Sequence, residues 1–185
     1  MKSSTSPSFD RDLSDSLAAI SACIESRQHM PAKILTYALI DSLAWAASDK
    51  QPKEARKNFE AWVSRWLAPE LTKIGNEISA VDLYAGRCAV LHTMTPNSEL
   101  ANSGRARTIA YAWGSAKVEA LDYAFKAKGL RGVAAIHYDD LYSALKTAVA
   151  TFLTDAAADK ALAARVSEAA SQHYVYINNS RPTEE

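Results

Sequence analysis

The sequence predicts a mainly α-helical protein with one domain, and three observations support this fold class. Apolar residues recur at three- and four-residue spacing over several long stretches, which is the spacing of an amphipathic helix. The chain has 185 residues, of which 48% are hydrophobic and 23% charged, so it is long enough and apolar enough for a core of its own. Turn-forming clusters separate the periodic stretches, and no linker, repeat or charge block divides the chain.

The periodic stretches define the expected helices. Four of them lie in the first half of the chain, at residues 10–28, 31–48, 53–67 and 77–92. Pro31 lies in the first turn of the second helix, and Pro69 is expected to end the third. A long final helix is expected from Asp139, with a break around residues 156–159.

A small β element is a further expectation for the region between residues 107 and 138. Residues 107–113 and 132–138 are rich in β-branched and aromatic side chains and are candidates for two strands. Residues 115–128 between them have a helical pattern. We expect one domain over residues 9–177 and disordered tails at residues 1–8 and 178–185.

The composition predicts the cellular compartment and argues against some classes of binding partner. Lys+Arg and Asp+Glu both total 21, so the net charge is zero, which argues against a protein that coats nucleic acid or an anionic membrane. The cysteines, Cys23 and Cys88, lie in apolar surroundings and are expected to be reduced core residues of a cytoplasmic protein. Residues 1–12 lack the apolar run of a secretion signal, and the longest apolar stretch, residues 34–47, is interrupted by Asp41 and too short to span a membrane.

An arginine stands out on the helix expected over residues 77–92. At about 100° per residue this helix is apolar on nearly all sides, and such a helix is buried on both faces. Arg87 lies among the apolar residues, where a charge is costly unless it is paired or holds a ligand. Gly86, beside it, costs about 1 kcal/mol in mid-helix relative to alanine, so another backbone or a ligand is expected to approach closely there. The expected partner of the arginine is one of three carboxylates, Asp41, Glu77 or Asp82.

The segment from Asp82 to His92 carries the pattern R-x-x-x-x-H at the end of this helix, formed by Arg87 and His92. It resembles the HEPN superfamily of small helical-bundle proteins. The resemblance implies a HEPN-like bundle and a metal-independent endoribonuclease, a toxin or defence effector, whose active site consists of Arg87 and His92. The family brings the motifs of two chains together in a dimer, and an antitoxin or regulatory protein is a further partner. This chain departs from common forms of the motif at Cys88, where a polar residue is usual, and at Met94, where toxins controlled by adenylylation carry a tyrosine.

The two residue types fit RNA cleavage without a metal or other cofactor. The reaction needs the 2′-hydroxyl deprotonated, the leaving oxygen protonated and the charge of the phosphate held. Histidine titrates near neutral pH, and arginine stays charged and binds phosphate through two parallel hydrogen bonds. Residues five apart on an α-helix point about 140° away from each other, so a single motif converges poorly on one phosphate. We therefore expect each site to be built from both chains of a homodimer.

The apolar faces of the same helix also predict a homodimer. One face packs in the bundle, while the other exposes an apolar patch unless something covers it, and such patches mark association sites. The alternative is that residues 107–155 of the same chain cover this face. The second face carries Leu83, Tyr84, Val90 and Leu91.

Further residues are candidates for binding substrate. The polar segment over residues 93–107 ends in Arg105 and Arg107, and it is either a substrate-binding loop that adds phosphate contacts or an ordinary connection. Tyr84 is a third candidate.

Two residues of the second helix are expected to position the side chains of Arg87 and His92 without contacting the substrate. Asp41 lies in an apolar stripe, where it either pairs with Arg87, orients His92, or occupies a partly exposed edge. Tyr37 lies one turn earlier on the same face.

Residues 137–140 place a histidine beside two carboxylates. A metal site is one interpretation, but no second ligand cluster has matching spacing. We expect Asp139 or Asp140 to cap the last helix instead, and we expect no metal or other cofactor.

Two other functions remain open. One is a non-catalytic helical binding module of the same fold that recognises a protein partner or a nucleotide. The other is a small-ligand pocket lined by aromatic residues at helical spacing, Tyr37, Trp45, Trp62 and Trp66.

Overall fold

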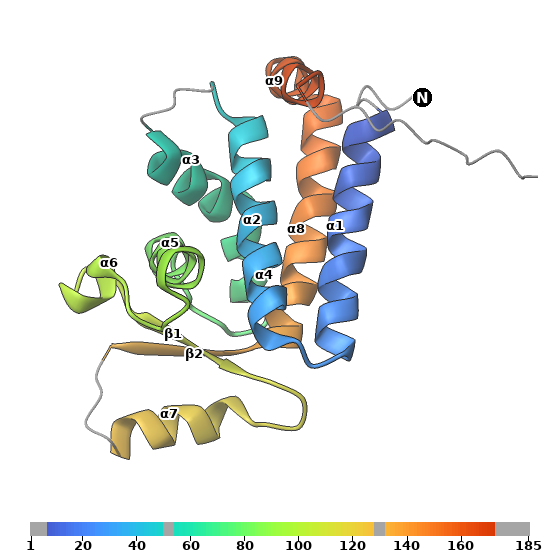
Figure 1. The fold of residues 1–185 in the computed structure, drawn as a ribbon. Helices are drawn as coiled ribbons and strands as arrows, with labels where there is room; N and C mark the ends of the chain where they lie inside the picture. Colours follow the sequence, from blue (N-terminus) through green and yellow to red (C-terminus); the bar gives the residue numbers. More distant parts are fainter. Residues whose placement is uncertain (1–6, 50–53, 128–131, 173–185) are drawn as a thin grey trace, which may run out of the picture.

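The structure is a computed structural model, which describes residues 7–49, 54–127 and 132–172 (Figure 1). It is mainly helical with a small two-stranded parallel sheet, so the predicted fold class is confirmed. No helix among the described residues is long and apolar enough to cross a membrane. Most of the two expected tails lies outside the described residues, and residues 7 and 8 already belong to the first helix.

Three long helices run side by side and enclose much of the core (Figure 1). They are α1 (Pro7–Glu25), α2 (His29–Ala47) and α8 (Tyr138–Ala158). The Tyr142 hydroxyl of α8 donates a hydrogen bond to the Leu17 carbonyl of α1 at 2.8 Å, which ties the first and last parts of the chain together. The last helix, α9 (Lys160–Ala170), crosses the end of this bundle. The expected break lies at Asp159, whose side chain accepts hydrogen bonds from the first turn of α9.

Aromatic side chains fill the centre of the bundle. Trp62 and Trp66 both pack against Phe152, at ring-centroid distances of 6.1 and 5.0 Å. Trp62 and Tyr37 are each 1% exposed, whereas Trp45 is 37% exposed. The hypothesis of a pocket lined by these aromatic residues is therefore wrong, because Trp62, Trp66 and Tyr37 are core residues.

The third helix does not end before Pro69 as predicted. It begins as α3 (Ala55–Trp62), widens into the π-helical turn η2 (Val63–Leu67), and continues as α4 (Ala68–Lys73). Proline lacks the N–H that an α-helix interior requires, but the first turn of a helix does not need that donor. Pro69 lies in the first turn of α4, so the chain remains helical through it.

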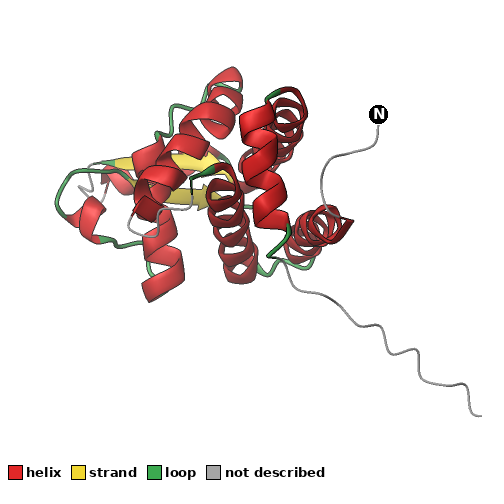
Figure 2. Ribbon diagram, turned by 90° about the horizontal axis from the view of Figure 1, so that it is seen from above, coloured by secondary structure: helices red, strands yellow, loops and turns green. Residues whose placement is uncertain are grey.

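A β-α-β unit lies beside the long helices (Figure 2). Strand β1 (Thr108–Ala112) pairs in parallel with β2 (Val133–His137), with Thr108 opposite Val133 and Ala112 opposite His137. Parallel strands need a crossover connection, and helix α7 (Val118–Ala127) provides it. In Figure 1 this helix lies on one side of the sheet and α2 and α5 on the other.

The N-cap residue of the last long helix, α8, differs from the one predicted. His137, rather than Asp139 or Asp140, is the N-cap residue of α8, and its Nδ1 accepts a hydrogen bond from the Asp139 N–H at 3.3 Å. Its Nε2 lies 3.0 Å from the Gly114 carbonyl. A carbonyl can only accept, so Nε2 carries the proton and Nδ1 is free to cap the helix.

Candidate active site around Arg87 and His92

The helix that carries the motif is α5 (Ala80–Cys88), and it runs directly into the π-helical turn η3 (Ala89–Thr93). Ser79 and Asp82 form a reciprocal capping box at its start, which satisfies two backbone N–H groups of the first turn. Met94 ends the turn in the left-handed conformation, with φ of 51°. The chain then leaves helical geometry immediately after the motif.

The motif residues lie in direct contact. Arg87 Nη1 is 2.9 Å from His92 Nε2, although the two residues are five positions apart. The prediction that one chain's pair diverges by about 140° is therefore wrong, because it assumed an uninterrupted α-helix. A π-helical turn is wider and joins residues five apart by its backbone hydrogen bonds, so His92 in η3 lies closer to the face of Arg87 than in an ideal α-helix.

A carboxylate of a neighbouring helix completes the cluster. Arg87 Nε donates to Asp41 Oδ2 of α2 at 2.9 Å, across 46 positions of sequence. The side chains of Arg87 and Asp41 are 20% and 30% exposed, and His92 is exposed. The structure thus selects Asp41 among the three expected partners, and it brings together Arg87, His92 and Asp41 at the surface. We call these three residues the Arg–His–Asp cluster.

The hydrogen bonds define the charge and proton positions in this cluster. A guanidinium can only donate, so His92 Nε2 accepts from Arg87 and holds a lone pair. In that state the imidazole is neutral and its proton is on Nδ1. Burial alone lowers the pKa of Arg87, but the hydrogen bond and the charge of Asp41 outweigh it and hold that pKa above its ordinary value.

Tyr84 borders the cluster on the side of α3. The guanidinium carbons of Arg87 and Arg56 lie 5.9 and 5.6 Å from the centre of its ring, and the ring of Phe59 packs edge-on against it. Burial is the main cause that raises the pKa of Tyr84, and its interaction with the neighbouring Cys88 adds to it. The phenol therefore stays neutral beside the arginine.

Tyr37 supports the helix that carries the motif rather than the cluster itself. Its hydroxyl is hydrogen-bonded to that of Tyr111 on β1, and burial is the main cause that raises its pKa well above the ordinary value. An added Cβ at Gly86 would lie 2.5 Å from Tyr37 Oη and 3.2 Å from Ile109 Cδ1. A close approach does occur at Gly86, but side chains of α2 and β1 make it, and not a backbone or a ligand as expected.

Arg105 and Arg107 do not join the cluster. Arg107 donates from Nε and Nη2 to Asp82 Oδ2, at 3.0 and 2.7 Å, and its backbone N–H donates to Oδ1 of the same carboxylate. Arg105 pairs with Glu99 of the short helix α6 (Glu99–Asn102) at 3.2 Å. The guanidinium of Arg107 is committed to the carboxylate that caps α5, so it holds β1 against this helix.

The same chain covers the two apolar faces of α5. Leu83 is fully buried and Val90 is 5% exposed, and both belong to the core. Tyr84 and Leu91 are partly buried against that core. Cover thus comes from within the chain, and the apolar patch expected there does not form. Residues 107–155 supply only part of this cover, through Ile109 of β1, because α3 also packs on the helix through Phe59, which lies outside that range.

The two cysteines and residues 137–140 form no metal site among the residues that the structure describes. Cys23 and Cys88 are free and only partly buried. Asp139 Oδ2 lies 3.6 Å from His137 Nδ1. Within the described segments, no group of three or more His, Cys, Asp or Glu side chains is placed to hold a metal ion.

Sequence reasoning missed Lys33 and Tyr111, which line a pocket on the other side of α5. Periodicity assigned Lys33 only to a helix and Tyr111 only to a strand, so no signal in the sequence brought the two together. In the comparisons with known proteins, no family model, curated protein or solved structure matches this chain. Fold and site therefore define the class of protein here: a helical domain with an attached β-α-β unit and a surface cluster of arginine, histidine and carboxylate.

Proposed function

We propose that this protein is a HEPN-like, metal-independent endoribonuclease that cleaves RNA at the Arg–His–Asp cluster. The observation that supports it most is the 2.9 Å contact between Arg87 Nη1 and His92 Nε2 at the surface. A permanent cation and a neutral imidazole in contact are the two groups that this reaction needs. Asp41 on Nε holds the guanidinium so that its other end faces His92.

The proposed reaction is transfer of the phosphate to the neighbouring 2′-oxygen. Arg87 binds the non-bridging oxygens of the phosphate, and this draws Nη1 away from His92 and frees the Nε2 lone pair. His92 then takes the proton of the 2′-hydroxyl while the 2′-oxygen attacks phosphorus. The bond to the 5′-oxygen breaks, and an imidazolium protonates that oxygen. The products are a 2′,3′-cyclic phosphate and a 5′-hydroxyl.

One histidine cannot be base and acid in the same step, so we propose that the second histidine comes from a second copy of the chain. A two-fold axis near the cluster places two arginines close together, which is repulsive unless an anion lies between them. An RNA phosphate is that anion. We place this activity in a cytoplasmic toxin or defence effector under the control of an antitoxin or other regulatory protein.

The test is cleavage of single-stranded RNA in the presence of EDTA. Wild type is compared with Arg87→Ala and His92→Ala, and with Arg11→Ala as a matched control, since Arg11 is exposed on α1 away from the cluster. We expect the first two variants to lose about 100-fold or more in rate and the control to keep it. An oligonucleotide with 2′-deoxyribose at the cleavage site should resist cleavage. Equal cleavage by all four proteins would sink the proposal.

A second candidate is a non-catalytic module that binds a protein partner or a nucleotide. It is favoured by one observation: Arg87 already has two hydrogen-bond partners within its own chain. A guanidinium satisfied in this way also fits a purely structural role. This candidate predicts no cleavage by wild type and a saturable complex with the partner.

A further inference from the structure

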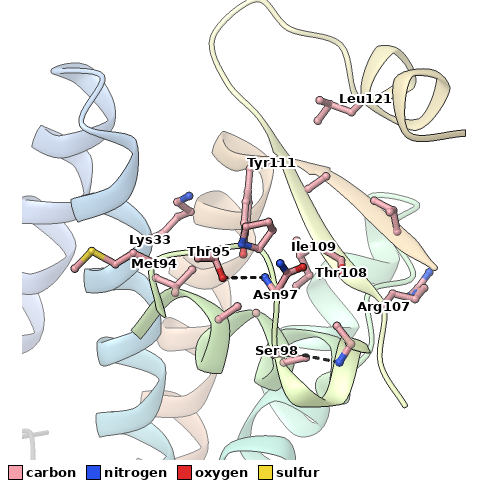
Figure 3. Close-up of a pocket in the computed structure, with 18 of the residues that line it drawn as sticks. Lys33, Met94, Thr95, Asn97, Ser98, Arg107, Thr108, Ile109, Tyr111 and Leu121 are labelled. Carbon is pink, nitrogen blue, oxygen red and sulfur yellow. Dashed lines mark hydrogen bonds between the residues drawn. The ribbon is translucent and has the colours of Figure 1, made fainter. Parts of the chain in front are cut away.

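A pocket separates α5 and η3 from the sheet, on the side of α5 that faces β1. Its volume is about 390 Å³, within the range of sites for small molecules. Gly86 and Ala89 form the helical wall, Ile109 and Tyr111 the strand wall, and Leu121 and Phe125 the wall from α7. Figure 3 shows Lys33, Thr95 and Asn97 near the tyrosine, and Leu121 reaching in from α7.

The sequence of α5 accounts for the space. Where α5 and η3 face the pocket they carry the small residues Ala85, Gly86 and Ala89, whose side chains leave space beside the strand. The hydroxyls of Tyr37 and Tyr111 are hydrogen-bonded to each other close to Gly86, and this bond fixes Tyr111 in the strand wall. The pocket therefore forms because the side chains on this part of α5 and η3 are small.

The charge around the pocket is positive. Among the residues whose side chains the structure describes, two cationic side chains line it, Lys33 and Arg107, and no Asp or Glu does. Arg107 is neutralised by Asp82. Lys33 is half-buried and has no ion pair with any described residue, and its Nζ lies 5.5 Å from the centre of the Tyr111 ring. A partly buried ammonium without a carboxylate is costly, and an anionic ligand removes that cost.

The lining also restricts the body of the ligand. Trp113 has one face stacked on His29 at 4.1 Å and a second stacking contact with Tyr138 at 4.0 Å, so its ring is not open for a base to stack on. Lys33 lies over the ring of Tyr111. Contact is left to the aliphatic and aromatic side chains of the three walls, which suits an apolar body better than a nucleobase.

We propose that this pocket binds a small carboxylate-bearing molecule with an apolar body, and that Lys33 is its counter-ion. One lysine matches one negative charge. Thr95 and Asn97, exposed at the rim, offer further hydrogen bonds to the head group. This site is distinct from the Arg–His–Asp cluster, and its existence does not depend on RNA cleavage.

The experiment is calorimetric titration of the purified protein with phenylbutanoate, straight-chain alkanoates and the matched neutral alcohols. We expect saturable binding of at least one carboxylate and binding of its alcohol weaker by about tenfold. Lys33→Met should lose about tenfold in affinity for the carboxylate and leave the alcohol unchanged, while Lys33→Arg keeps most of the affinity. Lys146→Met is the matched control, because Lys146 also lies over a tyrosine ring, that of Tyr142 at 4.9 Å, but outside the pocket.

Three results would overturn the proposal. They are equal affinity for carboxylate and alcohol, equal affinity of wild type and Lys33→Met, and no saturable binding of any probe at millimolar concentration. Circular dichroism of each variant separates loss of binding from loss of fold. Ala89→Leu provides a second variant, because the larger side chain fills the space. It should abolish binding of both the carboxylate and the alcohol.

Discussion

At the scale of single residues, Arg87 and Gly86 illustrate how neighbours on one helix serve different contacts. The guanidinium of Arg87 is 20% exposed and is balanced by Asp41, so a charge on a largely apolar helix is tolerated. At Gly86, by contrast, there is no room for a side chain, since the hydroxyl of Tyr37 occupies the place of a Cβ. The position of Arg87 therefore depends on the absence of a side chain at the preceding residue.

We predict that Gly86→Ala destabilises the protein by about 2 kcal/mol, although alanine gains about 1 kcal/mol in helix propensity. The new Cβ would lie 2.5 Å from Tyr37 Oη, and this side chain is 1% exposed and cannot move aside. Urea denaturation measures the free energy of unfolding.

Tyr37→Phe provides the control, because it removes the oxygen that the new Cβ meets and leaves Cζ at 3.3 Å. In that background the cost of Gly86→Ala should fall to less than half. The same cost in both backgrounds would show that the contact with Oη is not the cause.

At the scale of secondary-structure elements, two π-helical turns change the direction of side chains and the length of the helices. η3 aligns residues five apart and so brings His92 to Arg87. η2 precedes Pro69 and allows the helix to continue through it. The link between α5 and β1 is electrostatic, because Asp82 is 3% exposed and accepts from both Ser79 and Arg107.

We predict that this link makes stability depend on pH in the acid range. Burial alone raises the pKa of Asp82, but the hydrogen bonds from Arg107 and Ser79 outweigh it and leave the pKa below its ordinary value. A carboxyl with a lowered pKa in the folded state stabilises fully above the unfolded value of about 3.9, and this contribution is lost as the pH falls through the folded value.

The measurement is urea denaturation from neutral pH down to the acid limb. Asp82→Asn should lower the free energy of unfolding by about 2 kcal/mol at neutral pH and flatten the fall on acidification. Asp15→Asn, at an exposed position of α1, is the matched control and should change neither quantity. An unchanged acid limb in Asp82→Asn would refute the assignment.

At the scale of the whole molecule, the bundle and the β-α-β unit together enclose α5. Leu83 and Val90 are buried within the chain, so the apolar character of this helix no longer requires a partner. The case for a homodimer now rests on chemistry, because the proposed reaction needs one histidine as base and another as acid.

We predict that a wild-type chain loses its activity when it is paired with a His92→Ala chain in a mixed dimer. If each site needs the histidine of both copies, an equal mixture after subunit exchange should show about one quarter of the wild-type activity, following the square of the wild-type fraction. A chain that acts alone should show about one half. A linear decline, or a monomer in sedimentation equilibrium, would reject the composite site and leave the single-chain cluster as the active centre.

The sequence by itself determined the helical class, the two strands with their helix between them, and the candidate pair Arg87 and His92. These follow from local patterns, since the periods of helix and strand depend on residues a few positions apart. Local rules also caused the errors, because Pro69 and the five-residue spacing were judged against an ideal α-helix.

Only the tertiary structure decided which charges meet. Asp41 reaches Arg87 across 46 positions, and the sequence left three carboxylates open as its partner. Asp82 reaches Arg107 across 25 positions, a pairing that the sequence did not indicate. The pocket beside Lys33 also arises only when α2, α5, β1 and α7 come together. Such pairings are set by the packing of elements distant in sequence, and a periodicity read along the chain does not contain them.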